Sequence, residues 1–119
     1  MKDEEKQNLN KPLELGGRTK KLALAIISLY TSLPKTTEAQ VLGRQVLRSG
    51  TSIGAHCREG RRAKSDADFI NKLQGALQEL DETAYWLDLL NESGIGKTER
   101  LEALRNRGGG TYSHLRDRD

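Results

Sequence analysis

The segment Ser52–Ile70, SIGAHCREGRRAKSDADFI, carries the residue types of this chain that are best suited to chemistry. His56 and Cys57 could act as a base and a nucleophile or as metal ligands. Adjacent residues on a helix point about 100° apart, so these two side chains do not form a catalytic pair. The other histidine, His114, is too distant to complete a zinc site with the single cysteine. The pattern indicates a hydrogen-bonded, packed histidine and a packed thiol.

Acidic residues gather further along the chain, at Glu79, Asp81, Glu82, Asp88 and Glu92. A di-metal centre of the ferritin-like kind would need Glu-x-x-His pairs, and the sequence has none. A solvated or salt-bridged helix face is the better interpretation. Glycine-rich stretches do not follow a strand pattern, so they do not predict a phosphate loop. The sequence therefore predicts a non-enzymatic protein with no cofactor and no metal.

Basic residues supply the remaining candidate chemistry, which is contact with the phosphates of a nucleic acid. The candidate residues are Arg44, Arg48, Arg58, Arg61, Arg62 and Lys64. The last four fall within seven positions at the predicted end of a helix. Basic residues are also expected there because they complement the helix dipole, so a purely structural role stays open. The net charge of +3 permits a polyanionic partner without requiring one.

The elements that must position these residues are predicted to be helices, because apolar residues recur along the chain at helical spacing. A first helix is predicted from Arg18 to Pro34, with one apolar stripe at Leu22, Ile26, Leu29 and Leu33 and a second at Ala23, Ile27 and Tyr30. The second helix carries its stripe at Leu42, Val46, Ser49, Ile53, His56 and Gly60. The third helix has the most regular stripe, at Phe69, Leu73, Ala76, Leu80, Thr83, Leu87 and Leu90. A short fourth helix would contain Leu101 and Leu104.

Capping signals set the expected ends of these helices. Thr37 with Gln40 resembles a capping box at the start of the second helix. Ser65 is the expected N-cap of the third helix, and Gly94 its C-terminal stop in a Schellman motif. Glycines 43, 50 and 54 lower the helix propensity of the second helix, which suggests close approach of a neighbouring helix. Ile53 and His56 are expected to face other helices.

The length of 119 residues suits one domain. We predict a flexible N-terminal arm over residues 1–17, a bundle over 18–107 and an irregular tail over 108–119. No apolar run approaches the length of a membrane span, which predicts a cytoplasmic protein without a membrane partner. Only 34% of the residues are hydrophobic, and the stripes on the first helix offer more apolar face than a monomer buries. A homo-oligomer is therefore expected.

The segment from Leu33 to Ile95 resembles the family of 23S rRNA intervening-sequence proteins. The shared features, within a match over roughly residues 18–105, are Leu33–Pro34, Gln45, Leu47–Arg48–Ser49, Ser52–Ile53, Arg58–Glu59, Ser65, Asp68–Phe69–Ile70, Glu79–Leu80 and Trp86–Leu87. The resemblance implies an all-α fold, an antiparallel up-down four-helix bundle assembled as a homopentamer. The accessory protein of diversity-generating retroelements is similar in fold, and it engages RNA and a reverse transcriptase through a basic surface. The resemblance thus favours RNA or DNA, and a protein such as a reverse transcriptase, as partners. A protein–protein adaptor without a nucleic-acid role is the alternative.

Two positions depart from the family pattern. His56 stands where the family usually has asparagine, and the fourth helix loses its period after Arg107, so that it is predicted to be short or incomplete. Codons exist for the segment RGGGTYSHLRDRD such that removing one base yields EAEELTHIFVTV, which has a helical apolar stripe. We therefore hypothesise a frameshift near Asn106.

Overall fold

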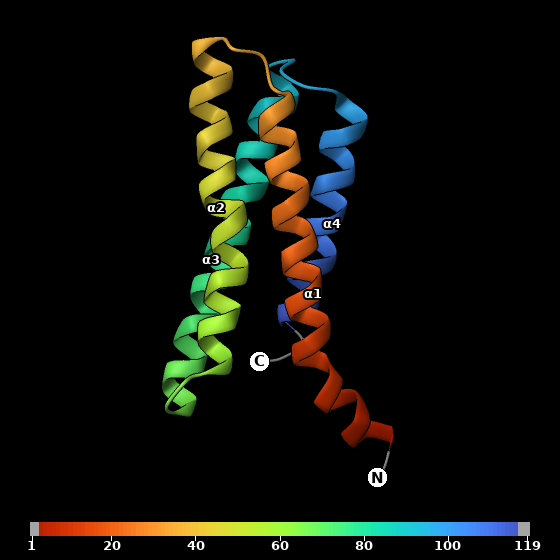
Figure 1. The fold of residues 1–119 in the computed structure, drawn as a ribbon, viewed down its shortest axis with the longest axis vertical. Coiled ribbons are helices and arrows are strands. Elements are labelled where there is room, and N and C mark those ends of the chain that lie inside the picture. Colours follow the sequence, from red (N-terminus) through yellow and green to blue (C-terminus); the bar gives the residue numbers. More distant parts are fainter. Residues whose placement is uncertain (1–2, 117–119) are drawn as a thin grey trace.

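The computed structural model describes residues 3–116, and the side chains from residue 15 to residue 111. This part of the chain forms four helices: α1 (Asp3–Ser32), α2 (Thr37–Arg61), α3 (Asp66–Glu92) and α4 (Thr98–Arg116). The helices run alternately up and down, and α1 packs on both α2 and α4 (Figure 1). No strand occurs within residues 3–116. The predicted all-α, antiparallel up-down four-helix bundle is confirmed, with α4 as its shortest helix.

The core lies between the four helices and is built from one apolar face of each. All four residues of the predicted stripe on α1 are at most 3% exposed. The stripe on α3 is buried from Leu73 to Leu90, and α2 contributes Val46 and Ile53. Burying each aliphatic side chain stabilises the fold by about 1.5–3 kcal/mol. The apolar periodicity therefore sets which face of each helix points inward.

The two ends of α3 follow their local sequence signals. The Ser65 side chain accepts a hydrogen bond from the backbone N–H of Asp68 at 3.1 Å, which confirms the predicted N-cap. After the last turn, Gly94 has a φ of +75°, and the N–H of Ile95 donates to the Leu90 carbonyl at 2.9 Å. This six-to-one hydrogen bond is that of a Schellman motif, as predicted.

The start of α2 differs from its prediction by one residue. Thr36, rather than Thr37, is the N-cap, and its Oγ1 accepts a hydrogen bond from the Ala39 N–H at 3.3 Å. Gln40 does not complete a capping box, because its Nε2 donates to the Pro34 carbonyl at 2.9 Å. Either threonine could cap the helix, and the extended backbone of Thr36 decides between them.

Close approach between α1 and α2 depends on the glycines of α2, as their low helix propensity suggested. A Cβ atom at Gly43 would lie 2.8 Å from Cδ1 of Leu33, and one at Gly50 would collide with Cδ1 of Ile26. Both positions face side chains of α1, and Ile26 is fully buried. These glycines therefore make room for large α1 side chains in the core.

Helical backbone extends further than predicted at both ends of the chain. α1 begins at Asp3 rather than at Arg18, and α4 continues through the three glycines 108–110 to Arg116. Helix over 108–116 thus replaces the irregular backbone predicted for the tail, and residues 3–17 of the predicted flexible arm are helical. Leu15 and Thr111 are buried, and this packing outweighs the weak helix propensity of the neighbouring glycines. Residues 1–2 and 117–119 lie outside the described part, and the division into arm, bundle and tail stays a prediction.

The four helices do not cover one another along their whole length. α2 and α3 continue below the end of α4, and α1 diverges from α2 in the same region (Figure 1). A groove lies between α1 and the α2–α3 pair at this end. None of the described helices is long and apolar enough to cross a membrane.

Candidate nucleic-acid interface

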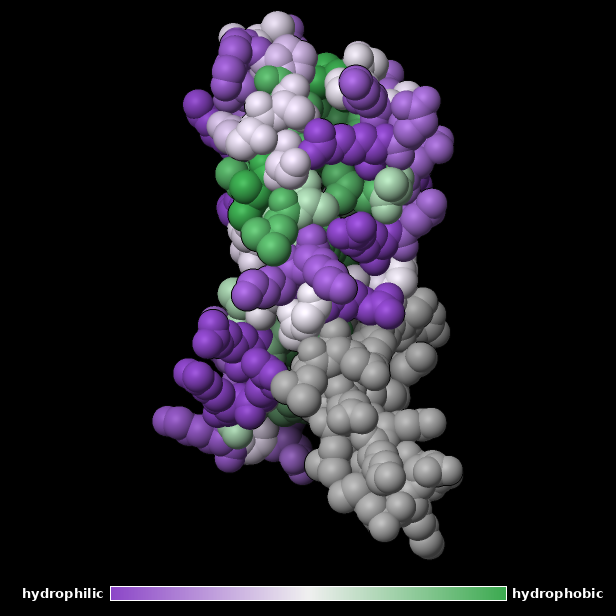
Figure 2. Space-filling model, turned by 45° about the vertical axis from the view of Figure 1, so that its right-hand side comes forward, coloured by the Kyte–Doolittle hydropathy of each residue, from purple (hydrophilic) through white to green (hydrophobic). Residues whose placement is uncertain are grey.

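The basic cluster predicted at the end of α2 is on the surface. Arg58 and Arg61 lie in the last turn of α2, Arg62 is its C-cap, and Lys64 follows in the loop to α3. All four residues are exposed. The lower left of Figure 2, over the end of α2 and the start of α3, is accordingly hydrophilic. The structure thus brings four of the six candidate residues together at one end of the bundle.

Two acidic neighbours of this cluster, Glu59 and Asp68, have contacts of their own. The Glu59 carboxylate forms an ion pair with Lys72 of α3 at 3.2 Å. The Asp68 carboxylate faces the backbone, because it accepts a hydrogen bond from the N–H of Lys64 at 3.4 Å. Both interactions hold the start of α3 against the end of α2.

Lys20 of α1 adds a basic residue that the predicted set did not include. It lines the same groove as Arg58 and Arg61, between α1 and α2. Arg61 reaches across this groove, since its Nη1 lies 3.7 Å from where a Cβ atom of Gly16 would stand. The basic surface is therefore formed by two helices. A run of lysines at residues 20–21 was visible in the sequence, but only the packing of α1 on α2 reveals their neighbours.

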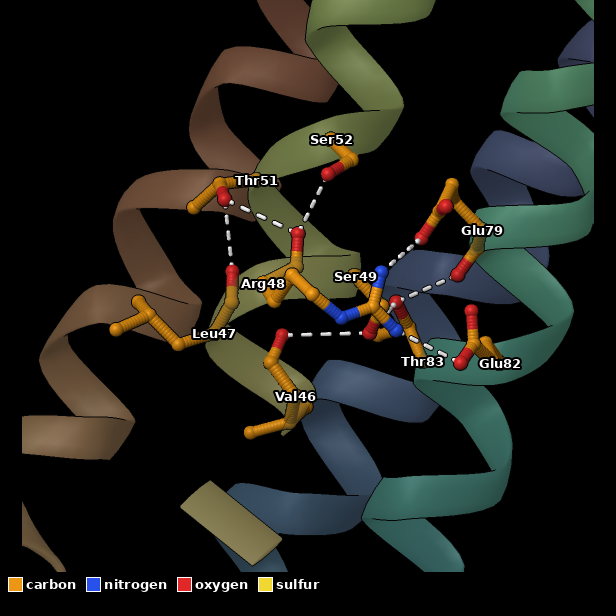
Figure 3. A network of polar contacts seen from close by, with 9 residues as sticks. All are labelled: Val46, Leu47, Arg48, Ser49, Thr51, Ser52, Glu79, Glu82 and Thr83. Carbon is orange, nitrogen blue, oxygen red and sulfur yellow. Dashed lines mark hydrogen bonds and ion pairs between the residues drawn. The ribbon is translucent and has the colours of Figure 1, made fainter. Parts of the chain in front are cut away.

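Arg48, by contrast, takes part in an ion-pair network and not in the basic cluster (Figure 3). Its Nη2 lies 2.7 Å from Oε1 of Glu82, and its Nη1 lies 3.3 Å from Oε2 of Glu79. The hydrogen bond to Glu82 is the main cause that raises the pKa of Arg48 above its ordinary value. Arg44 is exposed on the same helix, about 21 Å along the axis from Arg58. These two arginines are thus separate from the basic cluster.

The salt-bridged interpretation of the acidic residues is confirmed for three of them. Glu79 and Glu82 pair with Arg48, and Asp88 forms an ion pair with Arg105 of α4 at 2.9 Å. Among the residues whose side chains are described, no group of three histidine, cysteine or acidic side chains could hold a metal ion. Carboxylates on α3 therefore join the helices to one another.

A buried pair of hydroxyl groups lies beside this network. The Oγ atoms of Ser49 and Thr83 are 2.8 Å apart, and Thr83 Oγ1 is 2.7 Å from the carbonyl oxygen of Glu79 (Figure 3). Ser49 is fully buried and Thr83 is 2% exposed. The pair links α2 to α3 inside the core, where each hydroxyl needs a partner.

His56 packs between helices as predicted, but one nitrogen lacks the expected hydrogen bond. Ile53 is fully buried, and His56 is half-buried against α3, where its ring lies 3.1 Å from the position of a Cβ on Gly75. The buried Nδ1 atom of His56 has no hydrogen-bond partner among the described residues. Cys57 is half-buried and packs against the core. The prediction of a packed histidine and thiol is therefore confirmed, without the hydrogen bond at Nδ1.

Comparisons with known proteins agree with this architecture. The family model described as 23S rRNA-intervening sequence protein matches residues 11–111. A crystal structure of a protein of unknown function from the S23 ribosomal protein family of Bacteroides thetaiotaomicron is similar, with 39% sequence identity and a TM-score of 0.85. The match covers 90% of this chain and 96% of that chain. No curated protein matches the chain.

Proposed function

This chain belongs to the 23S rRNA-intervening sequence protein family, and from that premise we propose that it is a non-enzymatic, oligomeric helical bundle that binds RNA or DNA. The observation that carries the proposal is the exposed cluster of Arg58, Arg61, Arg62 and Lys64, with Lys20 of α1 in the adjoining groove. We name these five residues the basic end. Arg44 and Arg48 are left out, because one is distant and the other is paired with carboxylates.

Phosphate contacts explain how such a surface would bind. Arginine presents a planar fork of donors that matches phosphate oxygens, and lysine acts as a point charge. Neither group reads base edges here, so binding is largely independent of sequence. Each contact releases a counterion from the nucleic acid, and the affinity therefore depends on salt. With four contacts to a single strand, the slope of log K against log salt is about −3, so affinity falls roughly 50-fold between about 50 and 200 mM.

Oligomerisation would strengthen a surface that is weak in one subunit. Leu24 and Ile27 are 56% and 42% exposed on α1, and hydrophobic surface gathers in the upper half of the face shown in Figure 2. Exposed apolar side chains of this kind are typical of subunit interfaces. A ring of five subunits would repeat the basic end five times, and several copies acting on one polyanion increase its avidity. The double substitution Leu24→Glu, Ile27→Glu should reduce the molar mass seen by light scattering; an unchanged mass would place the interface elsewhere.

Retention on an immobilised nucleic-acid column tests the binding proposal. The substitutions Arg58→Gln, Arg61→Gln and Arg62→Gln should abolish retention at about 50 mM salt, and any binding that persists below this concentration should have a salt slope less steep by about 2. Helicity and oligomer size should not change, because all three side chains are exposed.

A matched control removes three positive charges elsewhere. Lys35, Lys97 and Arg107 are exposed, and the first two lie in loops at the opposite end of the bundle. Their replacement by glutamine lowers the net charge equally and should leave retention nearly intact. Equal loss in both variants would mean that total charge, and not the basic end, is responsible.

A protein–protein adaptor remains the alternative function. The exposed side chains of Val41 and Tyr85, 51% and 56% accessible, offer apolar contacts outside the basic end. If the wild-type protein is retained by neither RNA nor DNA at low salt, the adaptor becomes the better explanation.

A further inference from the structure

A groove of about 600 Å³ lies where α1 diverges from α2 (Figure 1). Lys20 of α1 and both Arg58 and Arg61 of α2 line it, while Phe69 and Leu73 of α3 form its apolar floor. No carboxylate occurs among its described lining residues. The groove therefore combines three cations with an apolar surface that contains an aromatic ring. Its volume lies within the range that small-molecule binding sites have in proteins.

Glycines line this groove on both of its sides. A Cβ atom at Gly16 of α1 would lie 3.7 Å from Nη1 of Arg61 on the α2 side. Phe69 lies against Gly60 of α2, since two of its ring carbons are 3.7 and 3.9 Å from the position of a Cβ there. The ring is half-buried and lines the groove, so that a flat group in the groove could contact it.

We propose that the groove admits unpaired bases of a single-stranded nucleic acid, an inference that rests on the proposed function. Phe69 stacks on a base, and Lys20, Arg58 and Arg61 bind the neighbouring phosphates. A single strand offers both chemical groups together, because its bases are free to turn toward the protein. A duplex keeps its bases stacked inside and offers only phosphates, so it gains nothing from the groove floor. The protein should therefore bind a single strand more tightly than a duplex.

The size of this preference follows from stacking. Base–aromatic stacking changes affinity by roughly 5- to 150-fold per base. One base on Phe69 should therefore make a single strand bind about tenfold more tightly than a duplex of the same length. The other two cations of the basic end, Arg62 and Lys64, are available to both kinds of nucleic acid.

Fluorescence anisotropy with a 12-nucleotide oligothymidylate and a 12-base-pair DNA duplex, both at about 50 mM salt, measures the preference. The substitution Gly16→Leu places a side chain in the groove, because a Cβ there would lie 3.7 Å from Nη1 of Arg61, and leucine favours the helix. It should weaken single-strand binding about tenfold and change duplex binding much less. Gly109→Leu is the matched control, because its Cβ meets no atom within 4 Å and it lies in α4, outside this groove. Phe69→Leu tests the ring directly, since it keeps apolar volume and removes the stacking face; circular dichroism checks its fold.

Each outcome decides between the two proposals. A preference for the single strand that is lost in Gly16→Leu and Phe69→Leu, but kept in Gly109→Leu, supports the inference. Equal binding of both nucleic acids, or a preference that survives Gly16→Leu, overturns it while the proposed function stands. Binding of neither nucleic acid overturns both.

Discussion

Replacing the glycine run of α4 by alanine should stabilise the protein. Gly108, Gly109 and Gly110 lie in the interior of a helix, where each glycine costs up to about 1 kcal/mol relative to alanine. A Cβ at Gly108 would make an ordinary contact, 3.7 Å from Cδ1 of Leu80, and one at Gly109 would meet nothing within 4 Å. These two positions accept a methyl group without any movement.

Gly110 requires one small adjustment. A Cβ there would lie 2.8 Å from Nη1 of Arg18, but this guanidinium ends a flexible, exposed side chain that is able to move away. The triple variant should therefore raise the free energy of unfolding by about 2 kcal/mol, which corresponds to roughly 8 °C in Tm for a domain of this size.

Replacing Gly50 by alanine should instead lower the free energy of unfolding. A Cβ at Gly50 would collide with the fully buried Ile26, which has no space to retreat. Overpacking a core costs about 1–3 kcal/mol, and the gain in helix propensity offsets only part of it. We expect Gly50→Ala to be destabilised by about 1 kcal/mol.

Urea unfolding followed by circular dichroism, at two protein concentrations to detect linked dissociation, measures both variants. An unchanged or lower midpoint in the triple alanine variant would mean that residues 108–110 are not helical in the folded protein. A rise in the midpoint of Gly50→Ala equal to that of one α4 glycine would refute the packing argument between α1 and α2.

Three further measurements test other parts of the structure. Thr83→Val should lower the free energy of unfolding by about 1–2 kcal/mol in urea melts, because it leaves the buried Ser49 hydroxyl with only the long 3.5 Å contact to the Val46 carbonyl; adding Ser49→Ala should cost less than the sum of the two single changes. Gly94→Ala should cost about 1–2 kcal/mol by thermal unfolding, because its φ of +75° disfavours a Cβ; no loss would contradict the Schellman ending. Resequencing of the gene should reveal an added base near the codon of Asn106; an unchanged reading confirmed by the intact-protein mass would refute the frameshift.

Local signals in the sequence determined the helices and their inward faces. The apolar stripe of α1 and that of α3 predicted which residues are buried, because a helix repeats every 3.6 residues whatever packs against it. Ser65 and Gly94 predicted the ends of α3 for the same reason, since capping uses atoms only a few residues away. The basic cluster at the end of α2 was likewise a local pattern.

Only the tertiary structure decided which of the basic residues lie close together. Arg48 belongs to α2 like Arg58, yet its rotation about the helix axis turns it toward Glu79 and Glu82 of α3. Lys20 joins Arg58 because α1 packs beside α2, a neighbour relation between residues far apart in sequence. The extent of α4 through its glycines also depends on burial against other helices, and not on local propensity. Which side chains of two helices meet depends on both helices, and a periodic pattern within one helix does not encode it.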